Sequence, residues 1–269
     1  MNKAKTNGKL NGSEVHYIVE GNGPPIILLH GMGSSIHNWD FLIPELVKAG
    51  YSAYALDLLG HGDSPKPDGP EQYHIEEVYT HFEKWVDALG FDEPVDVISH
   101  SMGGYLGLNF ARRQADKVKR LVLVDPFYSP KQVTGLIHLT VRNPAASSKM
   151  LKSLPTWAFT PAEKWHRMVS NGMPATAAAQ ISQDFKRADP NILYTAPTTK
   201  DLAPKLSQVK QETLVLWGEK DLTLAPRSFP KLVDGLPNAR GYSFPKTGHT
   251  PHLTKVNEFN RQVVDFIAA

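Results

Sequence analysis

The chain has 269 residues, of which 41% are apolar and 21% charged, and these proportions exclude a collagen-like, coiled-coil or disordered protein. With 29 basic and 27 acidic residues, the formal net charge of +2 is too small to indicate nucleic acid or an anionic membrane as a partner. The absence of cysteine excludes disulfides, thiolate metal sites and a cysteine nucleophile.

The first twelve residues are polar and lack the apolar centre of a signal peptide. No apolar run anywhere reaches about 18 residues, the length that a membrane-spanning helix needs. We therefore expect a cytoplasmic protein with no membrane insertion. Asn11-Gly12 is a good hairpin turn, and the alternation from Glu14 to Glu20 predicts the strand that follows it.

From residue 26 to residue 125, short apolar strands alternate with amphipathic helices. The run from Ile26 to Leu29 is apolar throughout, as in a strand buried on both faces of a parallel sheet. Glycines are expected to end two of the helices, because they adopt left-handed conformations readily. The predicted elements are a helix with Trp39, Leu42, Ile43, Leu46 and Val47 on one face that ends at Gly50, a strand at 54–56, a helix from Ile75 to Leu89 ending at Gly90, a strand at 95–98, a helix at 102–113 and a strand at 121–124.

The stretch 126–211 differs, because it has helical patterning without a convincing apolar strand and contains nine prolines. The alternation resumes with a strand at 213–217, a helix at 227–235, a strand at 241–244 and a helix at 256–268. Strands separated by such helices need crossover connections, which build a mostly parallel sheet. We predict an α/β fold: a mostly parallel central sheet of about eight strands with helices on both faces. Residues 1–125 and 212–269 would form its core, and 126–211 an inserted helical cap.

The clearest chemical motif is Ser99-His100-Ser101-Met102-Gly103-Gly104, between a strand and a helix. A serine on so sharp a turn holds its hydroxyl clear of the sheet, and the positions two residues away must be small because backbones meet there. The Met102 N–H, at the helix N-terminus, would face a developing oxyanion. The sequence therefore predicts that Ser101 is a nucleophile, although on motif alone it could simply cap the helix.

Three further loops support this prediction. His30-Gly31-Met32-Gly33 follows a buried strand, and its glycines would let the Met32 N–H serve as a second oxyanion donor. Asp221 follows the strand at 213–217, at the sheet edge where ligands of parallel sheets gather. His249 follows the next strand along the chain. The order Ser101, Asp221, His249 is that of a nucleophile, an acid and a base.

The whole chain resembles the α/β-hydrolase superfamily, in its capped, cofactor-free branch of esterases, haloperoxidase-like proteins and carbon–carbon hydrolases. The turn from Asp57 to Pro65 also matches that branch. The resemblance implies Ser101, Asp221 and His249 as catalytic residues, Met32 and Met102 as oxyanion donors, a cap at 126–211, and no metal or organic cofactor. Ser99 departs from the family pattern, which has glycine there.

Several residues allow other interpretations. Asp125 also ends a strand at this edge and is the second choice for the acid. His37, His100 and His252 lie close to the motifs, but no carboxylate stands near His249 and His252 at metal-ligand spacing, so we do not expect a zinc site.

The expected activity is that of a carboxylesterase, which transfers an acyl group to Ser101 and then to water. Phe127, Trp157 and Trp165 would line a pocket for an apolar or aromatic, small-to-medium ester. A carbon–carbon hydrolase, a lactonase and a haloperoxidase-like perhydrolase remain enzymatic alternatives, whereas epoxide hydrolases and haloalkane dehalogenases use an aspartate where Ser101 stands. A hydrolase-fold ligand receptor with slow turnover is the non-enzymatic alternative. The sequence leaves the oligomeric state open.

Overall fold

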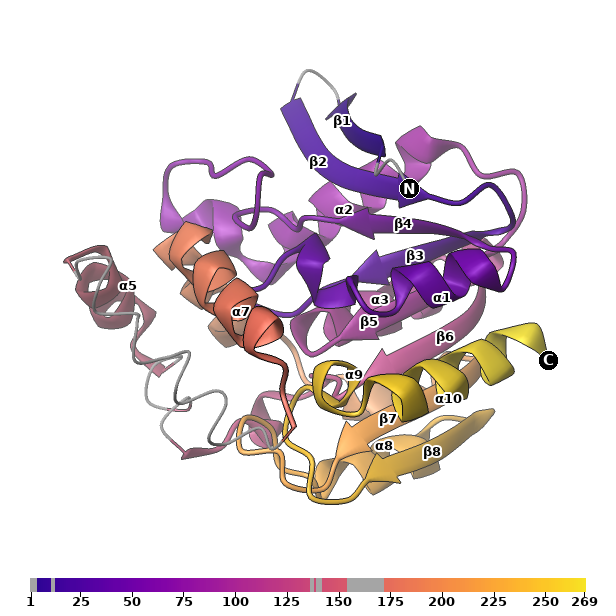
Figure 1. The fold of residues 1–269 in the computed structure, drawn as a ribbon. Helices are drawn as coiled ribbons and strands as arrows, with labels where there is room; N and C mark the ends of the chain where they lie inside the picture. The colour runs from indigo at the N-terminus through magenta and orange to yellow at the C-terminus, as the bar shows by residue number, and fades with distance from the viewer. Residues whose placement is uncertain (1–3, 11–12, 136–137, 139–141, 154–171) are drawn as a thin grey trace.

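The computed structural model describes residues 4–10, 13–135, 138, 142–153 and 172–269. They form an eight-stranded sheet in the order β1-β2-β4-β3-β5-β6-β7-β8 (Figure 1). The strands are β1 (Ala4–Leu10), β2 (Ser13–Glu20), β3 (Pro25–Leu29), β4 (Ser52–Leu56), β5 (Val95–His100), β6 (Val118–Val124), β7 (Glu212–Gly218) and β8 (Ala239–Phe244).

The sheet is mostly parallel, as the sequence predicts. Only the β1–β2 and β2–β4 pairs are antiparallel, and the pairs from β4 across to β8 are parallel. Leu10 pairs with Ser13, which confirms the expected hairpin, while its turn residues 11–12 lie outside the described residues. The carboxyl ends of β5, β6, β7 and β8 therefore meet at one edge of the sheet.

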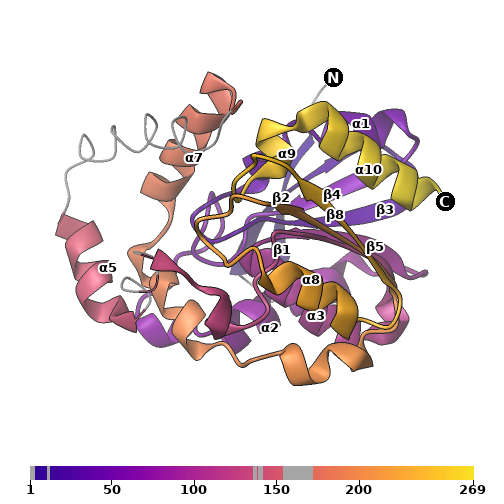
Figure 2. The ribbon, with the colours of Figure 1, turned by 90° about the horizontal axis from the view of Figure 1, so that it is seen from below.

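Helices cover both faces of the sheet (Figure 2). One buried apolar cluster joins the sheet to α2, α3 and α8, and another joins the opposite face to α1 and α10. The strands between these layers are apolar because both of their faces are buried, as Ile27 and Leu28 are. The α-helices of the described residues are α1 (Ile43–Lys48), α2 (Ile75–Leu89), α3 (Met102–Arg113), α5 (Pro144–Ser153), α7 (Ala175–Arg187), α8 (Ser228–Gly235), α9 (Pro251–Thr254) and α10 (Val256–Ala268).

The helix predicted from Trp39 to Gly50 is divided in the structure. A short 3-10 helix, η1 (Ile36–Trp39), comes first, and α1 begins only at Ile43. Pro44 stands in the first turn of α1, where a residue without an N–H is tolerated and further inside the helix is not. The apolar side chains still face the sheet, so the periodicity predicts the buried face correctly but not the start of the helix.

The segment between β6 and β7 holds α5, α7 and short 3-10 turns within its described residues, and its only pairing there is an isolated bridge from Val133 to Leu224. Figures 1 and 2 place α5 and α7 at one end of the sheet, apart from the two helical layers. Helix α7 packs on the loop after β3. The Phe185 ring of α7 lies against Gly33 of that loop, where an added Cβ would come 2.5 Å from the ring. Among the described residues, no helix combines the length and apolar character needed to cross a bilayer.

Candidate active site

Ser101 forms a sharp turn between β5 and α3. Its φ of 51° and ψ of −116° lie in a region that residues with a side chain rarely adopt. Such a conformation stores about 1–3 kcal/mol and persists only where the surroundings enforce it. The hydrogen bonds from Ser101 N to Val124 O (3.0 Å) and from Phe127 N to Ser101 O (2.9 Å) hold it. The turn is therefore part of the fold rather than an ordinary helix cap.

Small residues surround this turn because backbones approach closely there. A Cβ on Gly103 would lie 2.6 Å from both Leu29 O and His30 O. A Cβ on Gly31 would lie 3.0 Å from Ser101 Cβ. The expected steric reason for small residues around Ser101 thus holds in the structure.

Ser101, His249 and Asp221 form a continuous hydrogen-bonded chain. Ser101 Oγ lies 2.8 Å from His249 Nε2, and His249 Nδ1 lies 2.7 Å from Asp221 Oδ2. The other carboxylate oxygen, Asp221 Oδ1, accepts from Thr223 N (2.7 Å) and Leu224 N (3.0 Å). The Asp221 side chain is fully buried, whereas that of His249 is 18% exposed. The three predicted residues, far apart in sequence, are thus brought together in the predicted order of contact.

Gly218 brings the Asp221 and His249 loops together. A Cβ on this residue would lie 2.0 Å from Gly248 O and 2.4 Å from Thr247 O, so only glycine fits at the end of β7. Two residues later, Lys220 N donates to Thr247 O at 2.8 Å. The loop after β8 is thereby held directly against the loop after β7.

His100 has a role that the sequence analysis does not identify. Its Nδ1 faces Asn38 Nδ2 at 3.4 Å, and its Nε2 lies 2.9 Å from His249 O. Since an amide nitrogen only donates and a carbonyl only accepts, the ring proton belongs on Nε2, which donates to His249 O. Burial, followed by the charges of His252 and His249, holds the His100 pKa well below its usual value. A neutral His100 therefore holds the backbone of His249 in place. In the sequence, the feature that could have indicated this role is the position of His100 at the end of a strand, directly before Ser101.

Asp125, the second choice for the acid, does not contact the His249 ring nitrogen that Asp221 bonds. It is fully buried at the end of β6, and its Oδ1 accepts from Gly218 N at 2.9 Å. Burial and, after it, the charge of Asp221 raise the Asp125 pKa well above its usual value. Asp125 therefore binds the backbone at the end of β7, whereas Asp221 binds the His249 ring.

The backbone N–H groups of Met32 and Met102 have the setting expected of oxyanion donors. Met102 is the first residue of α3, where N–H groups have no partner inside the helix. Among the described residues, neither N–H donates to another backbone group. The helix N-terminus also favours negative charge beside Ser101.

The predicted pocket residues are only partly covered. Trp157 and Trp165 lie outside the described residues. Phe127 lies beside Ser101 through its backbone, but its ring is buried in the main core and packs on Tyr105, with the two ring centroids 5.9 Å apart. Its predicted role in substrate binding stays a prediction.

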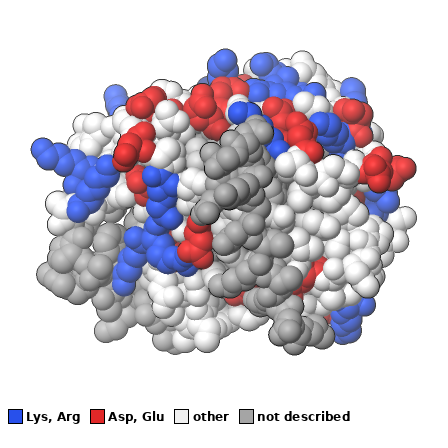
Figure 3. Space-filling view, turned by 90° about the horizontal axis from the view of Figure 1, so that it is seen from above, with Lys and Arg blue, Asp and Glu red and all other residues white. Residues whose placement is uncertain are grey.

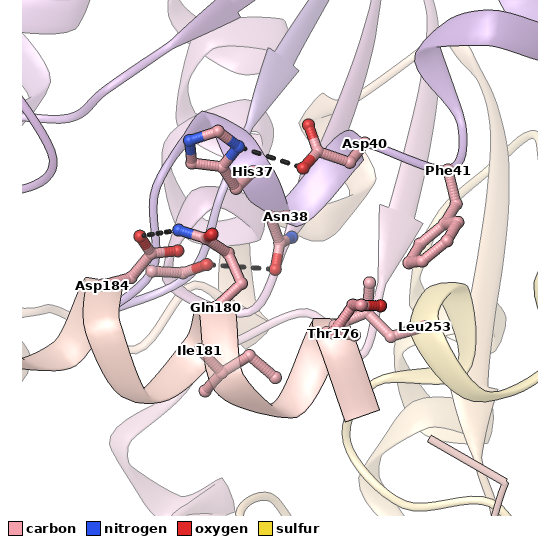
Figure 4. A pocket seen from close by; sticks show the side chains of 11 residues that line it. His37, Asn38, Asp40, Phe41, Thr176, Gln180, Ile181, Asp184 and Leu253 are labelled. Atoms are coloured by element: carbon pink, nitrogen blue, oxygen red, sulfur yellow. Dashed lines mark hydrogen bonds and ion pairs between the residues drawn. The ribbon is translucent and has the colours of Figure 1, made fainter. Parts of the chain in front are cut away.

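A cavity of about 130 Å³ lies between η1 and α7 (Figure 4). Its walls combine apolar side chains with a buried acid, Asp184, whose pKa is raised by burial. His37 lines it and pairs with Asp40 at 3.0 Å. The described lining is Ser34, His37, Asn38, Asp40, Phe41, Thr176, Ala177, Gln180, Ile181, Asp184 and Leu253, so Phe127 does not belong to it.

Within the described part of the chain, two groups of donors lie close enough together to hold a metal ion. In one, atoms of Asp125, Asp221 and His249 lie within 4.8 Å of one another, but both Asp221 oxygens and both His249 nitrogens already bind protein atoms. The second group is His16, Asp57 and Asp63, where His16 and the Asp63 N–H bond Asp57 Oδ2. Protein hydrogen bonds therefore already engage Asp221 and His249 in the first group and Asp57 in the second.

On the face seen in Figure 3, acidic and basic side chains lie side by side. No field of a single sign dominates the described part of that face, in keeping with the low net charge.

Comparison with known proteins places this geometry among related chains. Residues 24–256 match the sequence profile described as alpha/beta hydrolase fold. The chain is 26% identical over 273 residues to a 2-hydroxy-6-oxo-6-phenylhexa-2,4-dienoate hydrolase of Burkholderia cepacia, covering 96% of this chain and 93% of that protein. It is 29% identical to Lipase 1 of Psychrobacter immobilis, covering 92% and 78%. A bromoperoxidase structure from Bacillus anthracis superposes with a TM-score of 0.82 at 18% identity, covering 99% and 100%.

Proposed function

Because the chain belongs to the alpha/beta hydrolase fold family, we propose that it is a serine hydrolase that cleaves carboxylic esters through an acyl-serine intermediate. The observation that carries this proposal is the unbroken chain of hydrogen bonds from Ser101 through His249 to Asp221. A serine hydroxyl is a weak nucleophile at neutral pH, and an adjacent imidazole held by a carboxylate is the arrangement that activates it.

In the proposed reaction, Ser101 Oγ attacks the ester carbonyl carbon while His249 Nε2 takes the hydroxyl proton. His249 then gives this proton to the leaving alcohol oxygen as the bond between that oxygen and the carbonyl carbon breaks. Asp221 holds the proton of Nδ1 and stabilises the imidazolium formed in between. A water molecule, deprotonated in turn by His249, hydrolyses the acyl-serine and restores the serine hydroxyl.

The Met32 and Met102 N–H groups would bind the oxyanion of each tetrahedral intermediate. Each such donor is worth about 3 kcal/mol of transition-state stabilisation, by analogy with side-chain donors whose removal has been measured. Their availability among the described residues supports this assignment.

The proposed substrate is a small-to-medium ester with an apolar or aromatic group, processed in the cytoplasm without a metal or organic cofactor. Residues 126–211 would act as a cap on a core made of 1–125 and 212–269, because the chain leaves the sheet after β6 and returns at β7. The contact of Phe185 with Gly33 supports the cap assignment, since it places α7 on the loop that carries Met32.

Carbon–carbon bond hydrolysis is the second candidate. It is favoured by the similarity over 96% of the chain to the Burkholderia cepacia dienoate hydrolase. Lipase 1 of Psychrobacter immobilis favours the ester. The two activities would share Ser101, His249 and Asp221, so the substrate-binding groups decide between them.

The test is steady-state turnover of nitrophenyl esters of increasing chain length, beside a 2-hydroxy-6-oxodienoate, with Ser101→Ala as the control. The ester proposal expects repeated turnover with a higher kcat/KM on an ester. A higher kcat/KM on the dienoate would replace it by the second candidate. A single turnover per molecule on every substrate would favour a ligand receptor.

A further inference from the structure

We propose that Asp125 is a positioning residue that carries a proton and donates it in a hydrogen bond to the Asp221 carboxylate, fixing the group that orients His249. The kinetic consequence rests on the proposed function, whereas the location of the proton does not. The inference concerns the two buried acids at the ends of β6 and β7, which the reaction described above does not explain together.

The two carboxyl groups lie in a buried pair. Asp125 is 0% exposed, and so is the side chain of Asp221. Oxygen atoms of the two lie within 4.8 Å of each other and of a His249 nitrogen. Two ionised carboxylates at this separation, away from water, would repel each other strongly, so one of them must be neutral.

The hydrogen bonds decide which carboxyl is neutral. Asp221 accepts three N–H bonds, from His249, Thr223 and Leu224, and these stabilise a negative charge. Asp125 accepts one, from Gly218 N, and its Oδ2 receives no donor among the described residues. The proton therefore belongs on Asp125.

A hydrogen bond between two carboxyl groups requires that proton, because an ionised carboxylate has no donor. With Oδ2 protonated, the one buried oxygen of Asp125 that lacks a donor becomes a donor itself. Burial and the neighbouring charge of Asp221, which raise the pKa of Asp125, act in the same direction. The titratable groups that share this cluster with Asp125 among the described residues are Asp221 and His249.

The backbone holds Asp125 in place for this role. Its φ of 39° is left-handed, and Asp125 N donates to Leu216 O at 2.8 Å. Aspartate and asparagine tolerate this conformation better than most residues. Asp125 is thus fastened to β7 through both its backbone and its side chain, on the strand that leads to Asp221.

The first test locates the proton by infrared spectroscopy of the folded protein at neutral pH. We expect a carbonyl-stretching band of a neutral carboxylic acid that shifts in heavy water and disappears in Asp125→Asn. Persistence of the band in that variant, or its absence from the wild type, would overturn the proposal. The infrared band is measured without substrate. It therefore tests the protonation of Asp125 even if Ser101→Ala leaves ester turnover unchanged and the proposed function fails.

The second test measures kcat and KM of two variants at Asp125. Asp125→Gly accepts the left-handed φ but removes the donor, so kcat should fall roughly ten- to hundredfold with KM unchanged. Asp125→Asn can donate from Nδ2 to Asp221 and accept from Gly218 N, so it should rescue most of that loss. If Asp125→Asn is as damaging as Asp221→Asn, Asp125 acts as a carboxylate and the proposal is wrong. A kcat of wild-type size in Asp125→Gly would equally refute a positioning role.

Discussion

The side chain of Ser99 occupies the space that a methyl group on Gly107 would need. A Cβ on Gly107 would lie 2.7 Å from Ser99 Oγ and 3.3 Å from Ser99 Cβ. Ser99 is fully buried, and its hydroxyl donates to Val122 O at 3.4 Å. The family pattern has glycine where this chain has Ser99, and the larger side chain fits because residue 107 of α3 is itself a glycine.

This contact predicts that substitutions at the two positions are coupled. Gly107→Ala should lower the free energy of unfolding by about 1–3 kcal/mol, because the new methyl group overlaps Ser99. In a Ser99→Gly background, the same change should cost much less. A double-mutant cycle by denaturant unfolding measures the difference, and strictly additive effects would contradict the steric account.

Ser101 should be a position where stability and activity oppose each other. Ser101→Gly relieves the φ of 51°, so it should be about 1 kcal/mol more stable than Ser101→Ala, which keeps the strain. Both should lose roughly 10⁵–10⁶ in kcat, because the three residues act as a unit. Chemical denaturation and ester turnover provide the two readings. Equal stability of the two variants would mean that the turn is not strained.

Gly218→Ala should damage both the fold and the site. The added methyl would strike Gly248 O and Thr247 O, pushing the His249 loop away from Asp221. We expect a loss of several kcal/mol of stability and, in the folded fraction, at least a tenfold lower kcat. Gly90→Ala is the matched control: its methyl would meet nothing within 4 Å at a φ of 62°, so it should cost about 1–2 kcal/mol and leave kcat unchanged. A wild-type kcat in Gly218→Ala would show that the close approach does not position His249.

Stability should fall in acid partly because of His252. Burial, followed by the charge of His249, lowers the His252 pKa to about 3 from 6.5. Between these two pH values the unfolded chain binds a proton that the native protein does not, so the free energy of unfolding decreases as the pH is lowered from about 6.5 to about 3. One such group contributes up to about 1.4 kcal/mol per pH unit.

The His252→Phe variant tests this assignment. Its phenyl ring would keep the aromatic contacts with Trp39 and His100, whose ring centroids lie 5.3 and 4.6 Å away. Across that pH range, the unfolding free energy of the variant should decline less steeply than that of the wild type. The difference in slope should correspond to about one fewer proton taken up on unfolding. Parallel pH dependences would show that His252 is not the group responsible.

The order of the residues was enough to predict the sheet, its mostly parallel pairing and the loops that carry Ser101, Asp221 and His249. Apolar runs reveal strands buried on both faces, and parallel strands necessarily deliver their carboxyl ends to one edge. That reasoning places Asp125 and Asp221 at the same edge, and the preference for Asp221 came instead from the fuller match of its loop to the α/β-hydrolase pattern.

The contacts between the loops at this edge of the sheet are visible only in the tertiary structure. His249 Nδ1 meets Asp221 because Gly218 lets two loops touch, and Asp125 is left behind with a single backbone donor. Tertiary packing also brings His100 to the His249 carbonyl and Ser99 against Gly107. The His100–His249 contact spans 149 residues of the sequence and the Asp125–Gly218 contact 93, and local periodicity carries no information about which segments so far apart will touch.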